Sequence, residues 1–528
     1  MRELYSVSTF FRKLGSTILL RRDKRLFQTC STKPKSPFFR YTSGCWLYNE
    51  QLQFERRYIE FNIPGLTQIA GQILDTQCTK IVKLPEGLYN KVFSLKMENG
   101  EEILARIPNP NAGHAKSLVA SEVATLDFLR NVLDFPAPRV LGWSSPTIQP
   151  NPVGAEYILM EKMKGRQLSE VWDTMSEAQR LDLVKSLVAI EKKLASTKFE
   201  HHGSLYYQDT AADGRSITNS EIIKSGQEAV SKFVIGKKAH QYFSAVVQRE
   251  IAMIRKFESQ KPLNPSIFLG ITSTSSKNHI QLLERFLAKL PHILPSEGVS
   301  HPIFLHHDLH FDNIFVDELD PTKISSIIDW QAVYASPVFM QARFPLIIDC
   351  DGPYTWGAII PKLPQDFDTL PQNEKEIADD RLKGLRLKKF YELASRKVNP
   401  LLIKAMDAMR NEDDPTTFIF PIVEQASTFG PVPLREHLIQ IYEKWDQIMK
   451  HRGLEIQCPI SFSREEIDAP RQQLKAWAEA FNEYEGLRSQ LLGREGWVSH
   501  EEYEEAMRQW ESNKATLEVL RERLVKLS

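Results

Sequence analysis

Three polar side chains at the ends of short apolar strands constrain the fold of this chain more than any other feature. Residues 306–316 read HHDLHFDNIFV, and residues 327–330 read IIDW. Asp308 therefore lies in a tight loop, Asn313 stands directly before one apolar run, and Asp329 ends the next. Acidic groups at the ends of buried strands are costly unless they are paired or bind a metal ion. The pattern predicts a β-hairpin, with strands at 314–316 and 324–328, that presents a catalytic or metal-binding site.

These residue types suit phosphoryl transfer. A loop carboxylate such as Asp308 can accept the proton of an attacking hydroxyl, while Asn313 and Asp329 can bring hard oxygens to Mg²⁺. The alternative is that Asp308 is an ordinary turn residue that caps backbone amides. Because the other two residues complete the pattern, the sequence favours the catalytic interpretation.

A cluster of three histidines in the same loop leaves a zinc site as a second alternative. His306, His307 and His310 are separated by one and three positions. That spacing on a loop suits tetrahedral coordination poorly, and no cysteine is near. The sequence therefore favours the magnesium interpretation over zinc.

The stretch resembles the catalytic loop and metal-binding aspartate of the aminoglycoside phosphotransferase-like families, which share the fold of protein kinases. Those families carry a His-x-Asp-x-x-x-x-Asn loop, often with a second histidine at the place of His310. The resemblance implies that Asp308 is the catalytic base, that Asn313 and Asp329 bind Mg²⁺, and that His306 holds the loop. It also implies ATP as the cofactor and a hydroxyl of a small molecule as the acceptor.

The region before this loop predicts a small antiparallel sheet with one helix. Apolar alternation favours strands at 79–84, 91–97, 102–107 and 156–160, and Asn99-Gly100 suits a hairpin turn. Helical spacing is found at 55–75, 118–129 and 168–198, and almost throughout residues 381–528. The fold class expected from pattern and resemblance together is α+β: a bilobal protein-kinase-like fold, with a small antiparallel β lobe and a larger helical lobe.

By resemblance, the nucleotide site consists of six residues in the first lobe: Gly87, Asn90, Arg106, Glu122, Glu161 and Met163. Gly87 and Asn90 lie in the loop that would cover the phosphates, and Glu161 and Met163 lie in the hinge against the adenine. Arg106 takes the place of the phosphate-contacting lysine of kinases, and we expect it to form an ion pair with Glu122. The chain departs from protein kinases in having one glycine in the loop, and arginine in place of lysine.

The first 49 residues have the composition of a mitochondrial transit peptide. They hold ten basic and two acidic side chains, with apolar residues at roughly helical spacing between them. A basic tail that binds anionic surfaces is the alternative. The whole chain also resembles the fungal altered inheritance of mitochondria family, in phrases such as SEVAT at 121–125 and NPVGAEY at 151–157. This resemblance, with the basic leader, points to the mitochondrial matrix.

We therefore expect four segments. Residues 1–50 form the transit peptide, 51–163 the nucleotide-binding lobe, 164–450 the helical catalytic and substrate lobe, and 451–528 a helical extension. Ser499 and Glu502 form a capping box before the last helix. Apolar residues recur at about seven positions in that helix, which either packs on its own domain or contacts a partner.

Overall composition excludes several classes of protein. Lys+Arg and Asp+Glu are both 67, so the chain lacks the basic excess that is typical of a nucleic-acid-binding protein. Five cysteines without paired spacing do not make a disulfide scaffold, and no apolar run is long enough for a transmembrane helix. The predicted function is ATP- and Mg²⁺-dependent phosphorylation of a small-molecule hydroxyl. The rivals are a catalytically weak, nucleotide-binding scaffold involved in mitochondrial maintenance, and a purely structural helical protein.

Overall fold

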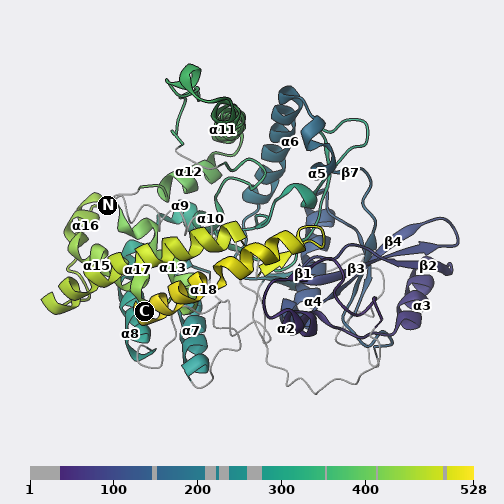
Figure 1. Cartoon of the computed structure of the whole chain (residues 1–528), viewed down its shortest axis with the longest axis horizontal. Coiled ribbons are helices and arrows are strands. Elements are labelled where there is room, and N and C mark those ends of the chain that lie inside the picture. The colour runs from purple at the N-terminus through teal and green to yellow at the C-terminus, as the bar shows by residue number, and fades with distance from the viewer. Residues whose placement is uncertain are drawn as a thin grey trace.

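A computed structural model describes residues 36–144, 151–207, 222–224, 237–258, 276–350, 354–411, 414–491 and 496–527. The first 35 residues of the predicted leader lie outside these ranges. The described chain forms a small β lobe and a larger helical lobe (Figure 1), which confirms the predicted α+β class.

The β lobe is built on a five-stranded antiparallel sheet of order β2-β3-β4-β6-β5. Its strands are β2 (Cys78–Lys83), β3 (Asn90–Met97), β4 (Glu102–Pro108), β5 (Val140–Trp143) and β6 (Ile158–Glu161). Side chains alternate between the two faces of each strand. Phe93, Leu95 and Met97 of β3 therefore join one core with α3 (Ile63–Leu74), whereas Leu104 of β4 faces α4 (Ala115–Asp127) on the opposite side.

Two details of this lobe differ from the sequence prediction. The single helix expected at 55–75 is two helices, α2 (Glu50–Arg57) and α3, because Asn62 caps a new helix start by accepting a hydrogen bond from the amide of Gly65. Strand β5 was not predicted, since it is only four residues long and follows a proline-rich stretch.

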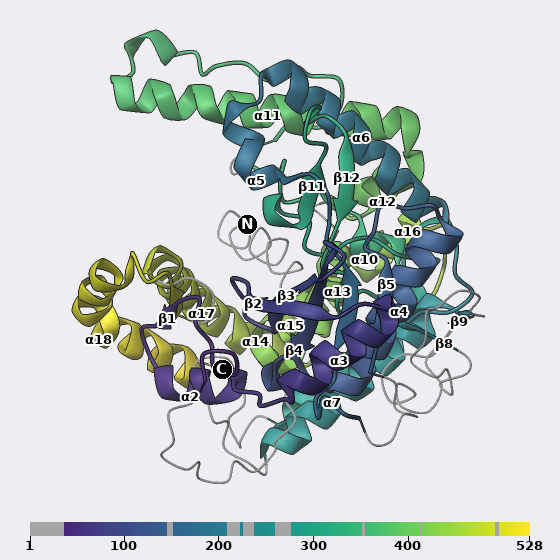
Figure 2. The same cartoon turned by 90° about the vertical axis from the view of Figure 1, so that its right-hand side faces the viewer.

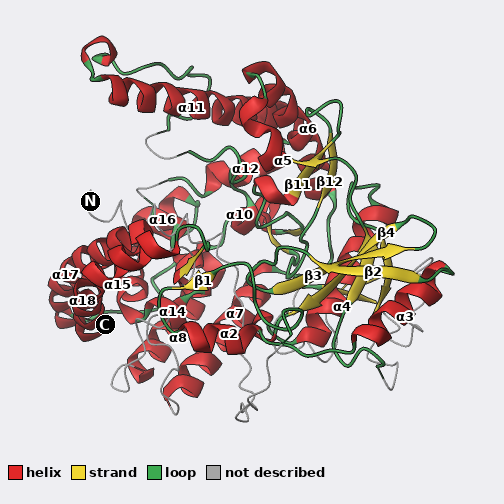
Figure 3. Ribbon diagram, turned by 45° about the vertical axis from the view of Figure 1, so that its right-hand side comes forward, coloured by secondary structure: helices red, strands yellow, loops and turns green. Residues whose placement is uncertain are grey.

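The helical lobe packs around one large apolar core. Helix α6 carries Leu183, Val184, Leu187 and Val188 on its buried face, at the spacing of an amphipathic helix. The long helix α11 packs along α6 and projects from the body of the molecule (Figure 3). The helices of this lobe and of the C-terminal extension are α5 (Leu168–Val171), α6 (Glu177–Ser196), α7 (Ala239–Glu258), α8 (Ser276–Ile293), α9 (Glu297–Ser300), α10 (Val338–Gln341), α11 (Gln372–Val398), α12 (Pro400–Ala408), α13 (Ile419–Glu424), α14 (Ala426–Phe429), α15 (Pro431–Glu443), α16 (Trp445–His451), α17 (Arg464–Leu491) and α18 (Tyr503–Leu527).

The predicted catalytic hairpin is present at the junction of the lobes. Strands β11 (Ile314–Val316) and β12 (Ile324–Ile327) pair, and β7 (Arg166–Gln167) adds a third strand directly after the connection between the lobes. Two further pairs of short strands are present. Strand β8 (Leu205–Tyr207) pairs with β9 (Ile222–Lys224), and β10 (Pro302–Ile303) pairs with β13 (Ser336–Pro337). Gly165, with φ +97°, lies so close to the carbonyl of Val316 that a side chain could not fit there.

The N-terminal part of the described chain lies beside the C-terminal helices α17 and α18 (Figure 2). Strand β1 (Cys45–Trp46) pairs with β14 (Trp497–Val498), which lies between α17 and α18. Residues 36–49, predicted as part of a leader, are therefore folded: Phe38 and Phe39 pack on the core of the sheet. The end of any leader has to be sought before Ser36.

The last helix follows its predicted cap. The hydroxyl of Ser499 accepts from the amide of Glu502, and α18 begins one residue later. Leu517, Leu520 and Leu524 are buried within the chain, where α18 packs along α17. The apolar face of this helix is thus covered intramolecularly. Among the described residues, no helix combines the length and apolar character that crossing a bilayer requires.

Candidate active site

His306 anchors the loop that the sequence predicts to be catalytic. Its Nε2 lies 2.9 Å from the carbonyl oxygen of Ile328, and its Nδ1 accepts from the amide of Asp308 at 3.3 Å. The ring also packs edge-on against the buried indole of Trp330. Burial lowers the pKa of His306, so the neutral ring connects the loop to the strand that leads to Asp329.

Hydrogen bonds join the three predicted site residues into one unit. The side-chain amide of Asn313 donates to the carbonyl of Asp308 at 2.8 Å, and the amide of Ile328 donates to the carbonyl of Asn313 at 2.9 Å. The carboxylate of Asp308 is 27% exposed and that of Asp329 is 42% exposed, whereas Asn313 is buried. Two partly open carboxylates thus flank a fixed amide.

Asp329 has a left-handed backbone, with φ +62°. This conformation is unfavourable for a residue with a side chain and is kept only where the surrounding structure enforces it. Here the hydrogen bonds of Ile328 and the buried Trp330 fix both neighbours. The turn directs the carboxylate toward the β lobe, where its Oδ1 lies 3.2 Å from Nη1 of Arg106.

The predicted ion pair between Arg106 and Glu122 is confirmed. Arg106 lies on the face of β4 that packs against α4, and Glu122 lies on that helix. The guanidinium is 11% exposed and the Glu122 carboxylate 3%. Burial lowers the pKa of Arg106, and the carboxylate of Asp329 opposes that shift. One guanidinium therefore bridges a buried acid of the β lobe and the acid of the catalytic hairpin.

The β2–β3 loop (residues 84–89) and the first residue of β3 each contribute one predicted residue. A side chain built at Gly87 would meet no atom within 4 Å, so the space beside this glycine is open. Asn90, the first residue of β3, donates from Nδ2 to Oε1 of Gln331 at 2.6 Å. Gln331 lies two residues beyond Asp329, so Asn90 ties the loop to the catalytic segment.

The two predicted hinge residues, Glu161 and Met163, differ in their contacts. The carboxylate of Glu161 contacts Arg130 at 2.5 Å and accepts from the amide of Arg139 at 2.8 Å. Its side chain therefore fixes the end of β6 to Arg130 and Arg139, and its own amide donates to the carbonyl of Arg139 at 3.0 Å. Met163 follows in the connection toward β7 and is half-buried.

The histidines do not gather into a metal centre. The ring of His307 packs near that of Tyr334, and burial beside Arg343 lowers its pKa to about 3. His310 lies 3.9 Å from the carboxylate of Asp308. Over the described ranges, no three His, Cys, Asp or Glu side chains are grouped as metal ligands. The zinc alternative has no support from this geometry.

The chemistry of the donors fits the magnesium nucleotide that the sequence predicts. Because Nδ2 of Asn313 is engaged by Asp308, its Oδ1 is the amide atom suited to a metal. That oxygen and the Asp329 carboxylate are hard ligands of the kind Mg²⁺ prefers. Arg106 adds a permanent positive charge beside them, and the open space at Gly87 admits close approach to the loop backbone.

Sequence reasoning missed three residues around the site. Lys91 falls in the apolar register of β3, with Phe93 and Leu95, and a charged residue at such a position is a readable signal of a buried network. Gln331 and Arg343, whose guanidinium donates to the carbonyl of His307, carry no such signal.

Residues 80–340 match the sequence model of the Phosphotransferase enzyme family. The resemblance on which the site prediction relied is thereby confirmed.

Two curated relatives cover most of the chain. A subtelomeric hrmA-associated cluster protein of Aspergillus fumigatus is 28% identical over 484 residues, which are 81% of this chain and 91% of that protein. Altered inheritance of mitochondria protein 9, mitochondrial, of Yarrowia lipolytica is 21% identical over 526 residues, covering 89% and 86%. Among solved structures, ADP-bound aminoglycoside phosphotransferase APH(2'')-Ib is 13% identical, with a TM-score of 0.35, over 78% of this chain and 97% of that one.

Proposed function

We propose that this protein transfers a phosphoryl group from ATP to a hydroxyl of a small molecule, with Mg²⁺. The observation that carries the proposal is the arrangement of Asp308, Asn313 and Asp329 on one hairpin, with the Arg106–Glu122 pair facing it. The family match over residues 80–340 supports the reaction class.

Asp308 is the proton acceptor in this proposal. Its carboxylate is partly exposed, and its main chain is fixed by His306 and Asn313. A fixed carboxylate can orient the acceptor hydroxyl and take its proton as the new bond forms. The hydrogen bonds to the loop backbone set this orientation before substrate arrives, which lowers the entropic part of the barrier.

Asn313 and Asp329 would hold Mg²⁺, and Arg106 would contact phosphate oxygens. When bound, ATP supplies the phosphoryl group and Mg²⁺ neutralises the charge of the phosphates. In the absence of nucleotide, Glu122 and Asp329 hold the guanidinium of Arg106 in place. The hinge around Glu161 and Met163 would contact the base through its main chain.

The proposed organisation assigns nucleotide binding to residues 51–163 and acceptor binding to residues 164–450. We place the protein in the mitochondrial matrix, on the basis of the basic leader and of the relatives whose name includes a mitochondrial location. The leader would end before Ser36, because residues 36–49 are packed on the β lobe.

One observation favours a second candidate, a nucleotide-binding scaffold with weak catalysis. Oδ1 of Asp329 already contacts Arg106 at 3.2 Å, a contact that a metal ion would have to share. Arginine cannot give up its charge, and it holds carboxylates in a fork. Such a protein would bind MgATP but turn over slowly.

Thermal shift with purified protein tests the proposal. MgATP should raise the melting temperature of the wild type, and Asp329→Ala should abolish that rise while leaving the fold intact. Asp308→Asn should keep the rise and abolish phosphoryl transfer to a metabolite extract supplied with γ-labelled ATP. A wild type that binds MgATP but labels nothing above the level of Asp308→Asn would favour the scaffold.

A further inference from the structure

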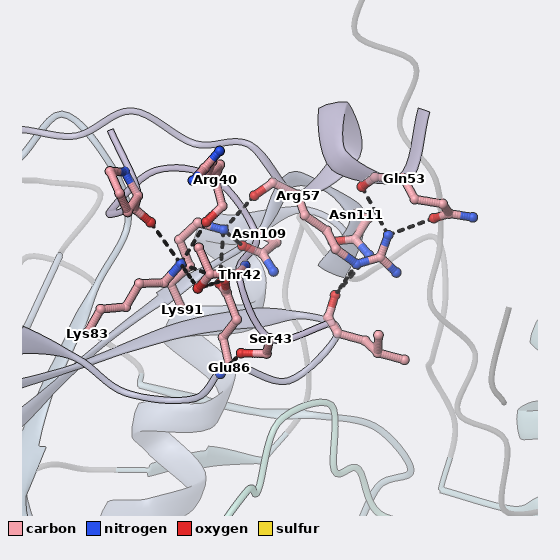
Figure 4. A network of polar contacts seen from close by, with 12 residues as sticks. Arg40, Thr42, Ser43, Gln53, Arg57, Lys83, Glu86, Lys91, Asn109 and Asn111 are labelled. Carbon is pink, nitrogen blue, oxygen red and sulfur yellow. Dashed lines mark hydrogen bonds and ion pairs between the residues drawn. The ribbon is translucent and has the colours of Figure 1, made fainter. Parts of the chain in front are cut away.

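A network of buried polar contacts holds the β2–β3 loop from the side away from the predicted nucleotide site (Figure 4). The network joins this loop to the N-terminal strap, which we define as residues 36–57 and which contains β1 and α2. The loop and the strap are separated by about forty positions in the sequence, so each bond between them closes a long stretch of chain.

Glu86 is the centre of this network. Its carboxylate, fully buried, accepts from the amide of Thr42 at 2.7 Å and from Nζ of Lys83 at 2.6 Å, and lies 3.2 Å from Nζ of Lys91. The amide of Glu86 donates to the hydroxyl of Ser43 at 2.7 Å. A carboxylate with this many donors is held in one position, because any displacement leaves buried charges without partners.

Lys91 shows that the network lies behind the sheet and not in the nucleotide cleft. It shares the strap-side face of β3 with Phe93, whereas Arg106 of the neighbouring strand points to the α4 face. Its ammonium donates to the carbonyl of Arg57 at 2.6 Å and to Oδ1 of Asn109 at 2.9 Å. Lys91 therefore acts on the loop by fixing its end.

Arg57 fastens the other side of the loop. Its Nε donates to the carbonyl of Leu88 at 3.0 Å, and its Nη1 donates to the side chain of Gln53 at 2.6 Å. The guanidinium lies over the indole of Trp46, 4.4 Å from the ring centroid. The loop is thus bonded to the strap through Glu86 and Leu88, on either side of Gly87.

The C-terminal helices hold the strap. Strand β1 pairs with β14, the amide of Leu47 donates to the carbonyl of Gly496 at 3.0 Å, and Tyr48 stacks on Trp510 of α18. A continuous set of contacts therefore runs from α18 through the strap to the loop beside the predicted phosphates.

We propose that Glu86 is a positioning residue, through which the strap and the C-terminal helices keep the β2–β3 loop ordered for nucleotide phosphates. This inference builds on the proposed function. Loops that cover phosphates in phosphotransferases gain affinity when they are ordered before binding, since less entropy is lost on closure. The anchored loop would compensate for the absence of a glycine-rich sequence.

The test compares Glu86→Gln with the matched control Glu55→Gln in the full-length chain. Glu55 lies in the same strap, but its carboxylate accepts a hydrogen bond from Nε2 of Gln51 at 2.8 Å on the exposed side of α2. Hydrogen exchange of the amides of residues 84–89 reports loop order without any need for activity. Titration with MgATP and steady-state kinetics report affinity and turnover.

In Glu86→Gln, we expect exchange of the loop amides to accelerate about tenfold and the Kd and KM for MgATP to rise about five- to tenfold, while kcat changes less than about twofold. Glu55→Gln should match the wild type in all four quantities. Unchanged loop exchange in Glu86→Gln, or a lower melting temperature with no change in the loop or in KM, would overturn the proposal.

A second variant keeps the test decisive if Glu86→Gln does not fold. Ser43→Ala removes only the acceptor of the Glu86 amide and should speed loop exchange about threefold; no effect would refute the anchor. If the wild type fails to bind MgATP, the proposed function falls, while hydrogen exchange still decides whether the strap orders the loop.

Discussion

Replacing Arg106 by alanine should destabilise the β lobe and weaken MgATP binding at the same time. The guanidinium is 11% exposed, and its partner Glu122 is 3% exposed. Removal of one member of a buried ion pair costs about 3–5 kcal/mol, because the other charge stays buried without compensation. The contact with Asp329 adds less than about 1 kcal/mol, since that carboxylate is 42% exposed and screened by water. The expected loss is a large part of the total stability of a typical domain.

Urea unfolding followed by tryptophan fluorescence measures this loss. Arg130→Ala is the matched control: Arg130 pairs with Glu161 in the same lobe, but the two side chains are 39% and 31% exposed. The control should therefore lose less than about 1 kcal/mol. Arg106→Lys should keep part of the nucleotide affinity, because the charge survives and only the fork is lost.

The double variant Arg106→Met/Glu122→Leu separates the ion pair from the rest of the effect. With both charges gone, no buried group remains unpaired, and much of the stability should return, although MgATP binding should not. The reasoning is refuted if Arg106→Ala costs no more than Arg130→Ala, or if the double variant is no more stable than Arg106→Ala.

Three further predictions concern the catalytic loop, its pH dependence and the leader. Asp308→Asn should reduce phosphoryl transfer at least about a hundredfold, because the general base is lost. The MgATP thermal shift should remain, because the metal ligands are unchanged. An active Asp308→Asn enzyme would exclude Asp308 as the base. Burial lowers the pKa of His307 to about 3, whereas an unfolded histidine titrates near about 6.5, so the unfolded chain takes up a proton first as the pH falls. The contribution of this residue to stability should be complete above about pH 6.5 and decline toward pH 3, and His307→Gln should lose less stability between pH 7 and pH 5 than the wild type in urea unfolding; equal losses would contradict the assignment. A reporter fused to residues 1–50 should reach the matrix and be shortened, and mass spectrometry of the mature native protein should find an N-terminus no later than Ser36. A full-length cytosolic reporter would argue against import, and a mature chain beginning after Arg57 would show that the strap is removed.

The sequence alone was sufficient for the catalytic hairpin because its signals are local. An apolar run of three residues defines β11, isoleucines at both ends define β12, and the polar residues that follow or precede these strands can have few roles in a buried setting. The resemblance to kinases placed Arg106 at the end of the third strand and Glu122, on the following helix, as its partner. That pair could be predicted because a buried guanidinium needs a carboxylate and the connection between the two elements is short.

Only the tertiary structure shows which residues hold the β2–β3 loop and which partner the Glu161 side chain has. The alternation of β3 indicates that Lys91 is buried, but nothing in the sequence shows that its partners come from the loop and from the end of α2. The resemblance assigned Glu161 to the hinge against the adenine, and only the tertiary structure shows that its carboxylate pairs with Arg130 of the helical turn Phe128–Val132, which follows α4. Strand β1 pairs with β14, which lies more than four hundred residues later in the sequence, and each strand contributes two residues. Pairings of this kind depend on how the whole chain is folded, because the free energy of a long-range contact comes from burial that no short segment possesses by itself.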